Sequence, residues 1–456
     1  MENKSFCKRV HKKREQNESA LSNQNRLCSA FWRFVCYNIG MRHYIALALL
    51  VTIFTAPWLA TTFPEQADYV FAWMKYVGDQ VAAVVAHNPR TIDELQKKYA
   101  SSTPRKPHKI RVLIVPGHEP DYGGAEFGVL KERDMTIELG EQLALFLSAN
   151  EKYEVIMSRT KQEWSPVFAE YFDRELDDII VWQKAHKEES LRRVVTNQTS
   201  SSPKVYHNSA PDSVAYRLYG LTKWSNENAV DIAIHIHFND YPGHGRIPGK
   251  YAGFAIYTPE AQYANSTTTR ALSETMFKRL SKYNPVSNLP VESDGIIEER
   301  ELIAIGANNT ADAASALIEY GYMYEPQFLN IDTRGLAIKD LAFQTYLGLE
   351  DFFNPRGVRS LAATYDTLVL PYIWRRILPE TSRELRDIYA LQTALQVEGV
   401  YPPQGKDQYD CPRTGKIGPC TKSSVEVFQK KYGIEENGVG EKTIGELNRL
   451  YSGRSL

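Results

Sequence analysis

Two short apolar runs, each leading into a histidine, constrain the fold of this chain more than any other feature. The first run is Ile110–Val115 and leads into Pro116-Gly117-His118; the second is Val230–Ile234 and leads to His237. Runs that are apolar along their whole length are typical of parallel strands, because helices cover both faces of a parallel sheet. Catalytic groups collect at the carboxyl ends of such strands. The pattern therefore predicts an α/β domain with a site at that edge of its sheet.

Further apolar segments alternate with helical patterns, as an α/β fold requires. We expect additional strands at Tyr153–Ser158, Gly253–Tyr257 and Ala314–Gly321. The periodicity predicts helices at Leu130–Asn150, Trp164–Val195, Val214–Asn228, Leu272–Lys282 and Lys339–Phe352. The polar segment Thr196–Ser213 is expected to be a mobile loop. These elements predict one domain at residues 109–353 with a mostly parallel sheet flanked by helices.

The N-terminal part predicts a membrane anchor. Residues 1–43 are rich in lysine and arginine, and residues 44–63 contain no charge; a bilayer-spanning helix needs about 20 apolar residues. The positive-inside rule then puts the basic tail in the cytoplasm and the rest of the chain outside. A cleaved signal peptide and a buried core helix are the alternatives, but the basic segment is long for a signal peptide and a core helix rarely lacks a polar face. Residues 64–108 would follow as a stalk and linker.

Charge and cysteines agree with this topology. The formal net charge of -1 gives no support for a nucleic-acid partner. Cys7, Cys28 and Cys36 fall on the cytoplasmic side, where thiols stay reduced. Cys411 and Cys420 fall outside and close a short loop, so we expect a disulfide between them; two free thiols are the alternative.

Four residues of the main domain have the chemistry of a metal site with a base. His118, Glu132 and His237 offer two imidazole nitrogens and a carboxylate oxygen, and catalytic zinc takes three protein ligands and keeps one position for water. Glu319 ends an apolar run, where an unpaired carboxylate is costly, and is the candidate base for that water. The residues alone leave a simpler reading open, in which each histidine makes an ordinary hydrogen bond and Glu132 favours a helix start.

From Lys109 to about Phe352 the chain resembles the zinc-dependent N-acetylmuramoyl-L-alanine amidases of the amidase-3 type. Motifs in the family's order carry the resemblance: Val112–Ala125, Leu130–Asp134, Val155–Thr160, Val230–Asn239 and Ile318–Tyr322. The resemblance implies one Zn²⁺ held by His118, Glu132 and His237, with Glu319 as the catalytic glutamate. It implies cleavage of the amide between N-acetylmuramic acid and L-alanine in peptidoglycan. Together with the predicted anchor, this leads us to expect an enzyme in a bacterial plasma membrane with its catalytic domain outside.

The chain departs from the family pattern beside two of the expected ligands. Val115 replaces the usual aspartate before Pro116, so a hydrogen bond that would support a ligand is missing. Glu119 replaces a glycine next to His118 and adds an acidic group. His235 lies two residues before His237, on the same strand face, and is an alternative ligand. The candidates for supporting the ligands are His235, Asp121, Asn239 and Arg159.

Residues 161–213 lengthen this chain relative to compact family members. The insertion could be a lid, a regulatory helix or a site for a protein activator. A solvent-exposed loop without a function is the alternative, and the two have equal weight.

The C-terminal part reads as a separate small helical unit. Residues 354–380 form a proline-containing connector, and residues 381–456 resemble the three-helix peptidoglycan-binding domain 1 type. The matching positions are core and turn residues, so they argue for the fold more than for sugar binding, and a spacer without ligand is the alternative. A weak repeat, Gly418–Thr421 and Gly440–Thr443, precedes two helical patterns, where each threonine could cap a first turn.

Two other functions stay open. A different zinc peptidase would cleave stem-peptide or crossbridge amides. A catalytically silent wall-binding scaffold is the second, and the altered residue Val115 keeps it open. Retention of His118, Glu132, His237 and Glu319 argues against the scaffold, which needs none of them.

Overall fold

The computed structural model describes residues 88–103, 108–200, 210–241, 245–354 and 365–453. The predicted basic tail, membrane span and most of the stalk lie outside these ranges, as do Cys7, Cys28 and Cys36. Among the described residues, no helix is both long enough and apolar enough to cross a membrane.

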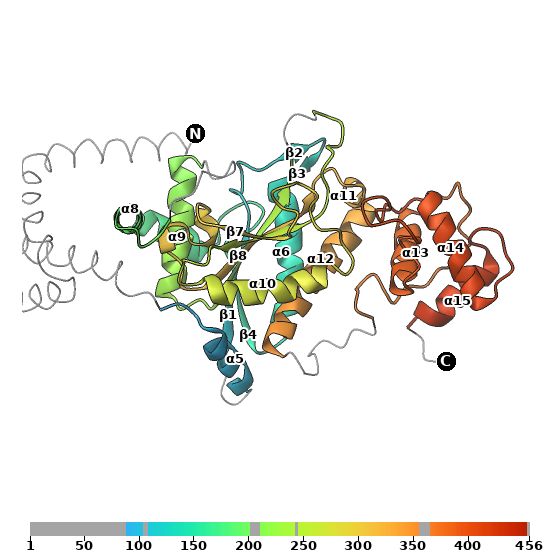
Figure 1. The fold of residues 1–456 in the computed structure, drawn as a ribbon, viewed down its shortest axis with the longest axis horizontal. Helices are drawn as coiled ribbons and strands as arrows, with labels where there is room; N and C mark the ends of the chain where they lie inside the picture. The colour runs from blue at the N-terminus through green and yellow to red at the C-terminus, as the bar shows by residue number, and fades with distance from the viewer. Residues whose placement is uncertain (1–87, 104–107, 201–209, 242–244, 355–364, 454–456) are drawn as a thin grey trace, which may run out of the picture. The chain divides into compact units, whose positions relative to one another are not determined.

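A six-stranded sheet forms the centre of the main domain (Figure 1). Its strands lie in the order β4-β1-β5-β8-β6-β7. Neighbouring strands run parallel except β6 and β8, which are antiparallel. The mostly parallel α/β sheet is therefore as predicted, although β7 was not. The strands are β1 Ile110–Pro116, β4 Tyr153–Met157, β5 Ile232–Asn239, β6 Ala255–Pro259, β7 Ile296–Glu299 and β8 Ala314–Tyr322, and a small hairpin comprises β2 Glu126–Phe127 and β3 Leu130–Lys131.

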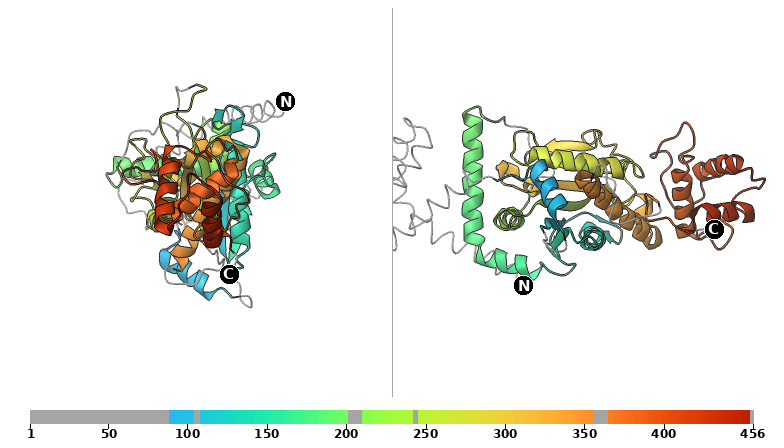
Figure 2. Two further views of the ribbon diagram at one scale, coloured as in Figure 1. Left: turned by 90° about the vertical axis from the view of Figure 1, so that its right-hand side faces the viewer. Right: turned by 90° about the horizontal axis from the view of Figure 1, so that it is seen from below.

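Helices cover both faces of this sheet (Figures 1 and 2). One face packs against α6 Glu132–Ser148, α10 Ser266–Leu280 and α12 Ile331–Phe353. The other packs against α7 Pro166–Arg174, α8 Leu176–Val195 and α9 Asp212–Glu227. The predicted helix Trp164–Val195 is thus two helices that meet at Glu175, where the backbone leaves the helical region without a proline or glycine to mark the break. The remaining elements of the domain are α5 Ile92–Ser101, the short α11 Pro326–Leu329 and two 3₁₀ turns at Ile303–Ile305 and Ala307–Asn309.

The two faces of β5 have different chemistry. Ile232, Ile234, Ile236 and Phe238 point into the larger hydrophobic core. The alternate residues lie on the opposite face, since successive side chains of a strand point to opposite sides; Ala233 there joins the core under α7–α9, and polar residues 235, 237 and 239 follow it toward the strand's end. One strand therefore supplies both part of the core and a row of polar groups.

Both site strands are longer than expected. The predictions ended the strands before His237 and at Gly321, whereas β5 continues to Asn239 and β8 to Tyr322. Polar side chains interrupt the apolar pattern near the end of each strand. Strands pair through backbone hydrogen bonds, so the pairing continues past the point where the apolar pattern ends. As a result, His237 and Glu319 are direct neighbours across the ladder.

Three helices make up the C-terminal part: α13 Leu385–Val397, α14 Pro419–Tyr432 and α15 Glu441–Tyr451. Cys411 and Cys420 form the predicted disulfide, with their Cα atoms 5.8 Å apart. The capping prediction is wrong, because glycines 418 and 440 occupy the N-cap positions without any side-chain cap.

The repeated threonines instead connect successive helices. The Gln392 side-chain nitrogen of α13 donates to Thr421 Oγ1 (2.9 Å), and that of Gln429 in α14 donates to Thr443 Oγ1 (2.8 Å). Each glutamine nitrogen also donates to a carbonyl of the loop before the next helix, at Lys416 (3.0 Å) and Gly438 (2.6 Å). The internal repeat is therefore a repeated helix-to-helix hydrogen bond.

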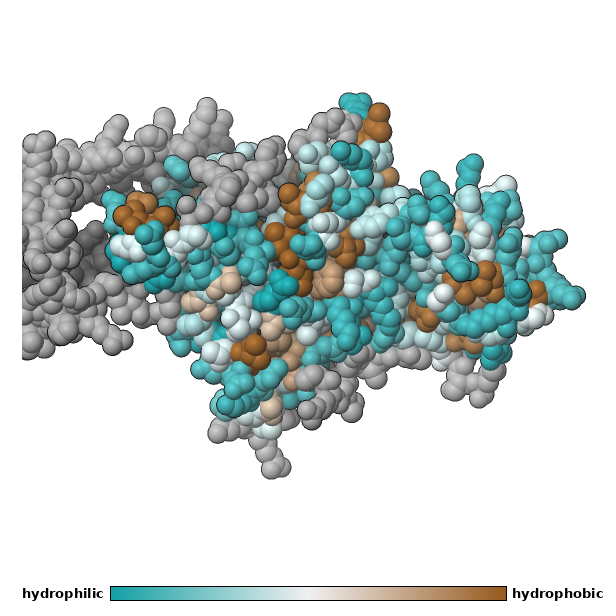
Figure 3. Space-filling model, in the orientation of Figure 1, coloured by the Kyte–Doolittle hydropathy of each residue, from teal (hydrophilic) through white to brown (hydrophobic). Residues whose placement is uncertain are grey.

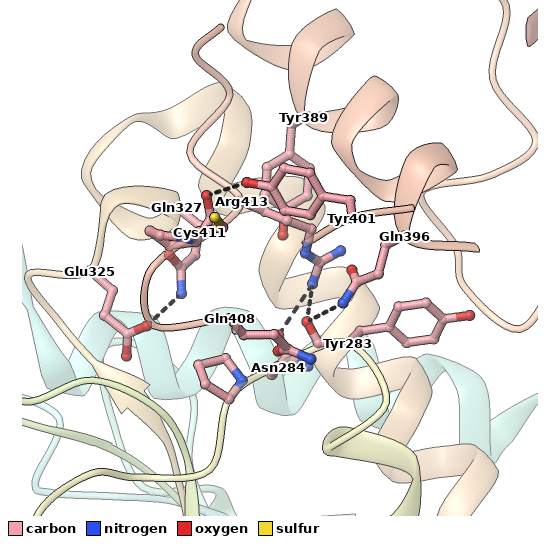
Figure 4. A pocket seen from close by; sticks show the side chains of 12 residues that line it. Tyr283, Asn284, Glu325, Gln327, Tyr389, Gln396, Tyr401, Gln408, Cys411 and Arg413 are labelled. Carbon is pink, nitrogen blue, oxygen red and sulfur yellow. Dashed lines mark hydrogen bonds between the residues drawn. The ribbon is translucent and has the colours of Figure 1, made fainter. Parts of the chain in front are cut away.

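The C-terminal helices pack on the main domain through α12 and α13, and one hydrophobic cluster contains residues of both. Arg413 adds polar contacts, donating to the Tyr283 carbonyl and to Asn284 Oδ1, each at 3.2 Å. Its guanidinium also lies over the Tyr389 ring. These residues line a small pocket at the joint (Figure 4). On the face drawn in Figure 3, apolar residues gather in separate patches within a mostly hydrophilic surface.

Candidate active site

The turn after β1 brings the first predicted ligand toward β5. His118 has a left-handed backbone (φ 69°), which is uncommon for a residue other than glycine. Gly117 precedes it, and a Cβ at that position would lie 2.4 Å from Cε1 of His237. Gly124, with φ +81°, lies against the His118 ring in the same way. The turn thus has the space for two imidazole rings only because glycines line it.

Glu132, the first residue of α6, lies between the two histidines. Its Oε1 is 3.0 Å from His237 Nδ1, and its Oε2 is 2.8 Å from His118 Nε2. The backbone N–H groups of Ala125 and Phe238 donate to the same carboxylate. Burial raises the pKa of Glu132, but the two histidines outweigh that effect and hold it below the ordinary value. The carboxylate is fixed from four directions in its ionised form.

These three side chains fit a metal ion. One ligand atom from each of His118, Glu132 and His237 lies within 4.8 Å of the others. The Nε2 atom of His118 is buried and makes no hydrogen bond to any residue that the structure describes, although Glu132 Oε2 is close. This geometry suits His118 Nε2 and Glu132 Oε2 binding the same ion, and not each other. Two imidazoles and one carboxylate are ligand types that catalytic zinc takes.

Glu319 lies beside this group on β8, opposite His237 in the ladder. Its Oε2 atom is buried and has no hydrogen-bond partner among the described residues. Burial raises the pKa of Glu319 well above the ordinary value, and the charges of Glu132 and Glu292 raise it further. A carboxyl group in this environment takes up a proton readily, which suits general acid–base chemistry.

Arg159 supports the turn from beneath. It is almost fully buried and donates to the carbonyls of Pro116 (3.0 Å), Gly117 (2.5 Å) and Arg133 (3.0 Å). Burial lowers its pKa to about 10, so it remains charged at neutral pH. The structure thus makes Arg159 a support for the backbone around His118.

The other predicted supporting residues differ in their surroundings. His235 is buried on the strand face of His237, but it is not part of the three-residue group. Burial, and to a lesser extent His237, lower the pKa of His235 to about 3, so its ring is neutral. Asp121 is exposed in the loop after His118. Asn239 donates from Nδ2 to Glu292 Oε1 (2.9 Å).

Sequence reasoning missed two carboxylates that connect the site to its surroundings. Glu292 lies in a loop before β7, where no apolar period or motif marks it. Glu119, noted only as an extra acidic group, accepts from Trp164 Nε1 (3.0 Å) and pairs with Arg217 of α9 (2.8 Å). The insertion is therefore joined to the loop that follows His118.

The geometry agrees with the comparison to protein families. Residues 112–331 match the N-acetylmuramoyl-L-alanine amidase family. The match begins in β1 and ends at the start of α12, so it includes all four residues of the site. We call this stretch the matched domain.

Several solved structures are similar to part of this chain. An N-acetylmuramoyl-L-alanine amidase from Clostridium difficile 630 is 16% identical, with a TM-score of 0.34, over 55% of this chain and 99% of that one. Ami1 from Mycobacterium smegmatis is 14% identical, with a TM-score of 0.36, over 54% and 98%. The CwlD amidase from Clostridioides difficile, solved with the GerS lipoprotein, is 14% identical, with a TM-score of 0.35, over 54% and 100%. No curated protein sequence matches the chain.

Proposed function

We propose that this protein is a zinc-dependent cell-wall hydrolase that cleaves the amide between N-acetylmuramic acid and L-alanine of the peptidoglycan stem peptide. The observation that carries the proposal is the convergence of His118, Glu132 and His237 beside Glu319. The family match over residues 112–331 supports the substrate class.

In this proposal His118, Glu132 and His237 hold the zinc ion. Zinc, when bound, supplies a Lewis acid that makes water more acidic and polarises a carbonyl group. Glu319 accepts the proton of the attacking water and passes it to the leaving amine of L-alanine. The buried setting that raises the pKa of Glu319 supports the second of these steps, because the proton is retained until the amine leaves. Arg159 keeps the His118 turn in place throughout.

The test uses the full chain in detergent with purified peptidoglycan, with and without a zinc chelator. We expect chelator-sensitive release of intact stem peptides with a free L-alanine amine, identified by mass. Glu319→Ala should retain zinc, measured by metal analysis, and lose release by at least about 100-fold, as expected for loss of a general acid–base group. A fully active Glu319→Ala chain would refute the assigned role.

The same experiment separates the two other functions. A zinc peptidase acting on stem-peptide or crossbridge amides would release shorter peptides, and its products would differ in mass. A silent scaffold would bind peptidoglycan without releasing anything, even with zinc present. The intact group of four site residues favours the hydrolase.

We further propose that residues 44–63 anchor the enzyme in a bacterial plasma membrane and that residues 381–456 contact peptidoglycan. Sequence supports both: an uncharged apolar segment after a basic tail, and resemblance to a wall-binding module. The insertion at 161–213 remains our candidate surface for a protein activator. Membrane fractionation and sedimentation of the protein with purified peptidoglycan test the first two assignments.

A further inference from the structure

We propose that Glu292 is a positioning residue that fixes the Asn239 side-chain amide so that its oxygen accepts a hydrogen bond from an N–H group of the substrate. The inference rests on the proposed function for its substrate, the amide-rich stem peptide. In the mechanism above Glu292 enters only through its charge, the smallest of the causes that raise the pKa of Glu319.

Glu292 is a buried carboxylate, 2% exposed, surrounded by hydrogen-bond donors. Asn239 Nδ2 (2.9 Å) and the Tyr257 hydroxyl (2.8 Å) donate to Oε1. The hydroxyls of Ser287 and Tyr322 donate to Oε2. A buried carboxyl group needs such hydrogen-bond partners, and those of Glu292 come from β5, β6, β8 and the loop before β7.

The contact with Glu292 determines which end of the Asn239 amide faces the site. A carboxylate oxygen accepts and cannot donate, so the NH₂ end of the asparagine must be the end beside it. The Oδ1 atom is left as the free end, and among the described residues no hydrogen bond reaches it. Asn239 is only half-buried. It therefore presents a fixed acceptor.

That acceptor lies next to the reacting groups. Residues 237 and 239 point to the same face of β5, because they are two positions apart on a strand. Glu319 is the ladder neighbour of His237. The register then shifts by one residue, so that Asn239 is opposite Tyr322 and not Gly321. This shift brings Asn239 and Tyr322 together at Glu292.

A stem peptide offers the matching chemistry. Its backbone presents N–H donors on both sides of the bond to be cleaved, and an oriented carbonyl acceptor distinguishes such a donor from an ester or ether oxygen. A site built to hydrogen-bond a substrate N–H rejects analogues that lack it.

The chain contains a matched control. Glu350 is 1% exposed and also accepts from two tyrosine hydroxyls and one asparagine amide, those of Tyr99, Tyr153 and Asn150. This network lies where β4 begins, at the edge of the sheet away from the site. Glu350→Gln and Glu292→Gln therefore remove similar charges from similar surroundings.

The experiment measures kcat, KM, zinc content and Tm of the full chain on an N-acetylmuramoyl tripeptide. We expect Asn239→Ala and Glu292→Gln each to lower kcat/KM by about 10-fold or more, the usual cost of one lost substrate hydrogen bond, with zinc content unchanged. Each variant is measured at its own pH optimum, which removes the effect of the Glu292 charge on Glu319. The double variant should then be no worse than Asn239→Ala alone, because Glu292 acts through Asn239. Glu350→Gln should retain wild-type kcat/KM below its Tm.

Additive losses in the double variant would overturn the proposal, as would an equal loss of kcat/KM in Glu350→Gln. A second pair keeps the test decisive if Glu292→Gln does not fold. Asn239→Asp removes the donor to Glu292, and adding Glu292→Gln restores a donor–acceptor pair in reverse, so the reversed pair should regain activity over Asn239→Asp. Failure to regain it counts against the proposal.

The proposed function can fail independently. If the zinc-loaded wild-type chain does not cleave the tripeptide, the amidase assignment is wrong. Calorimetry then measures the affinity of the same compound for wild type, Asn239→Ala, Glu292→Gln and the double variant. The same pattern of non-additive losses, now in affinity, decides the positioning role.

Discussion

Gly117 is the residue at which one added carbon would disturb the site most. A Cβ there would lie 2.4 to 2.7 Å from three atoms of the His237 ring. The ring cannot retreat easily, since Glu132 holds its Nδ1 atom. The need for glycine therefore arises from a contact between β1 and β5, which are more than a hundred residues apart in sequence.

We expect Gly117→Ala to lose zinc affinity and to lower the unfolding free energy by about 1–3 kcal/mol, the usual cost of forced overpacking. Metal titration and urea unfolding measure the two effects. Gly335→Ala is the control: no atom lies within 4 Å of the added carbon, and alanine in a helix stabilises by up to about 1 kcal/mol. Normal zinc affinity in Gly117→Ala would contradict the account.

Glu325 gives a prediction about pH. Burial raises its pKa, although hydrogen bonds from the Tyr322 and Gly253 N–H groups and from Gln327 oppose that effect. The folded chain binds this proton more tightly than the unfolded chain does. Its contribution to stability is therefore full below the ordinary value of 4.5 and is lost as the pH rises through the folded value.

Glu325→Gln removes this titration. The stability of the variant relative to wild type should rise with pH above about 4.5, because only the wild type loses a contribution over that range. Urea unfolding of both chains at several pH values from acid to neutral measures the difference. A difference that stays constant or falls with pH would contradict the expectation.

At the scale of elements, β5 explains how much of the site could be predicted from sequence. Its apolar residues follow from the sequence pattern, and the role of His237 follows from the resemblance. The strand and the placement of His237 at its end could therefore be predicted from sequence. The extension of the strand to Asn239 and the register shift opposite Tyr322 could not be predicted, because both depend on how β8 pairs with β5. Glu292 was inaccessible for the same reason: its partners come from three strands and a loop.

The glutamine–threonine connections of the C-terminal helices give a prediction at this scale. Thr443→Val keeps the shape of the side chain but leaves the buried Gln429 nitrogen with one acceptor fewer. We expect a loss of about 1–3 kcal/mol in unfolding free energy, the cost of an unsatisfied buried donor. Hydrogen exchange should be fastest in α14 and α15. Unchanged protection of both helices would show that the connection is unimportant.

The whole molecule, as far as it is described, has one dominant core. A single hydrophobic cluster includes Phe343 of α12 and Leu391 of α13, and Arg413 bonds the C-terminal part to the loop after α10. Sequence composition suggested a separate module because prolines and polar residues lie between the two parts, and composition does not report which surfaces pack together. Helix α5, the first of the described helices, is joined to this core by Lys98, which pairs with Asp231, and by Tyr99, which donates to Glu350.

We therefore expect the matched domain and the C-terminal helices to unfold together. Calorimetry should give one transition for both, and Arg413→Ala should lower its midpoint without dividing it, because the shared apolar contacts remain. Two separated transitions in the wild-type chain would contradict a common core.

The left-handed backbone conformation of His118 affects how this chain would respond to selection for stability. Glycine or asparagine would occupy that conformation with less strain, so a sequence optimised only for stability would not keep histidine there. Proteins tolerate such residues where activity requires them. A stabilised variant obtained by screening for heat resistance alone should therefore tend to replace His118, and would gain stability by giving up a residue of the candidate metal site.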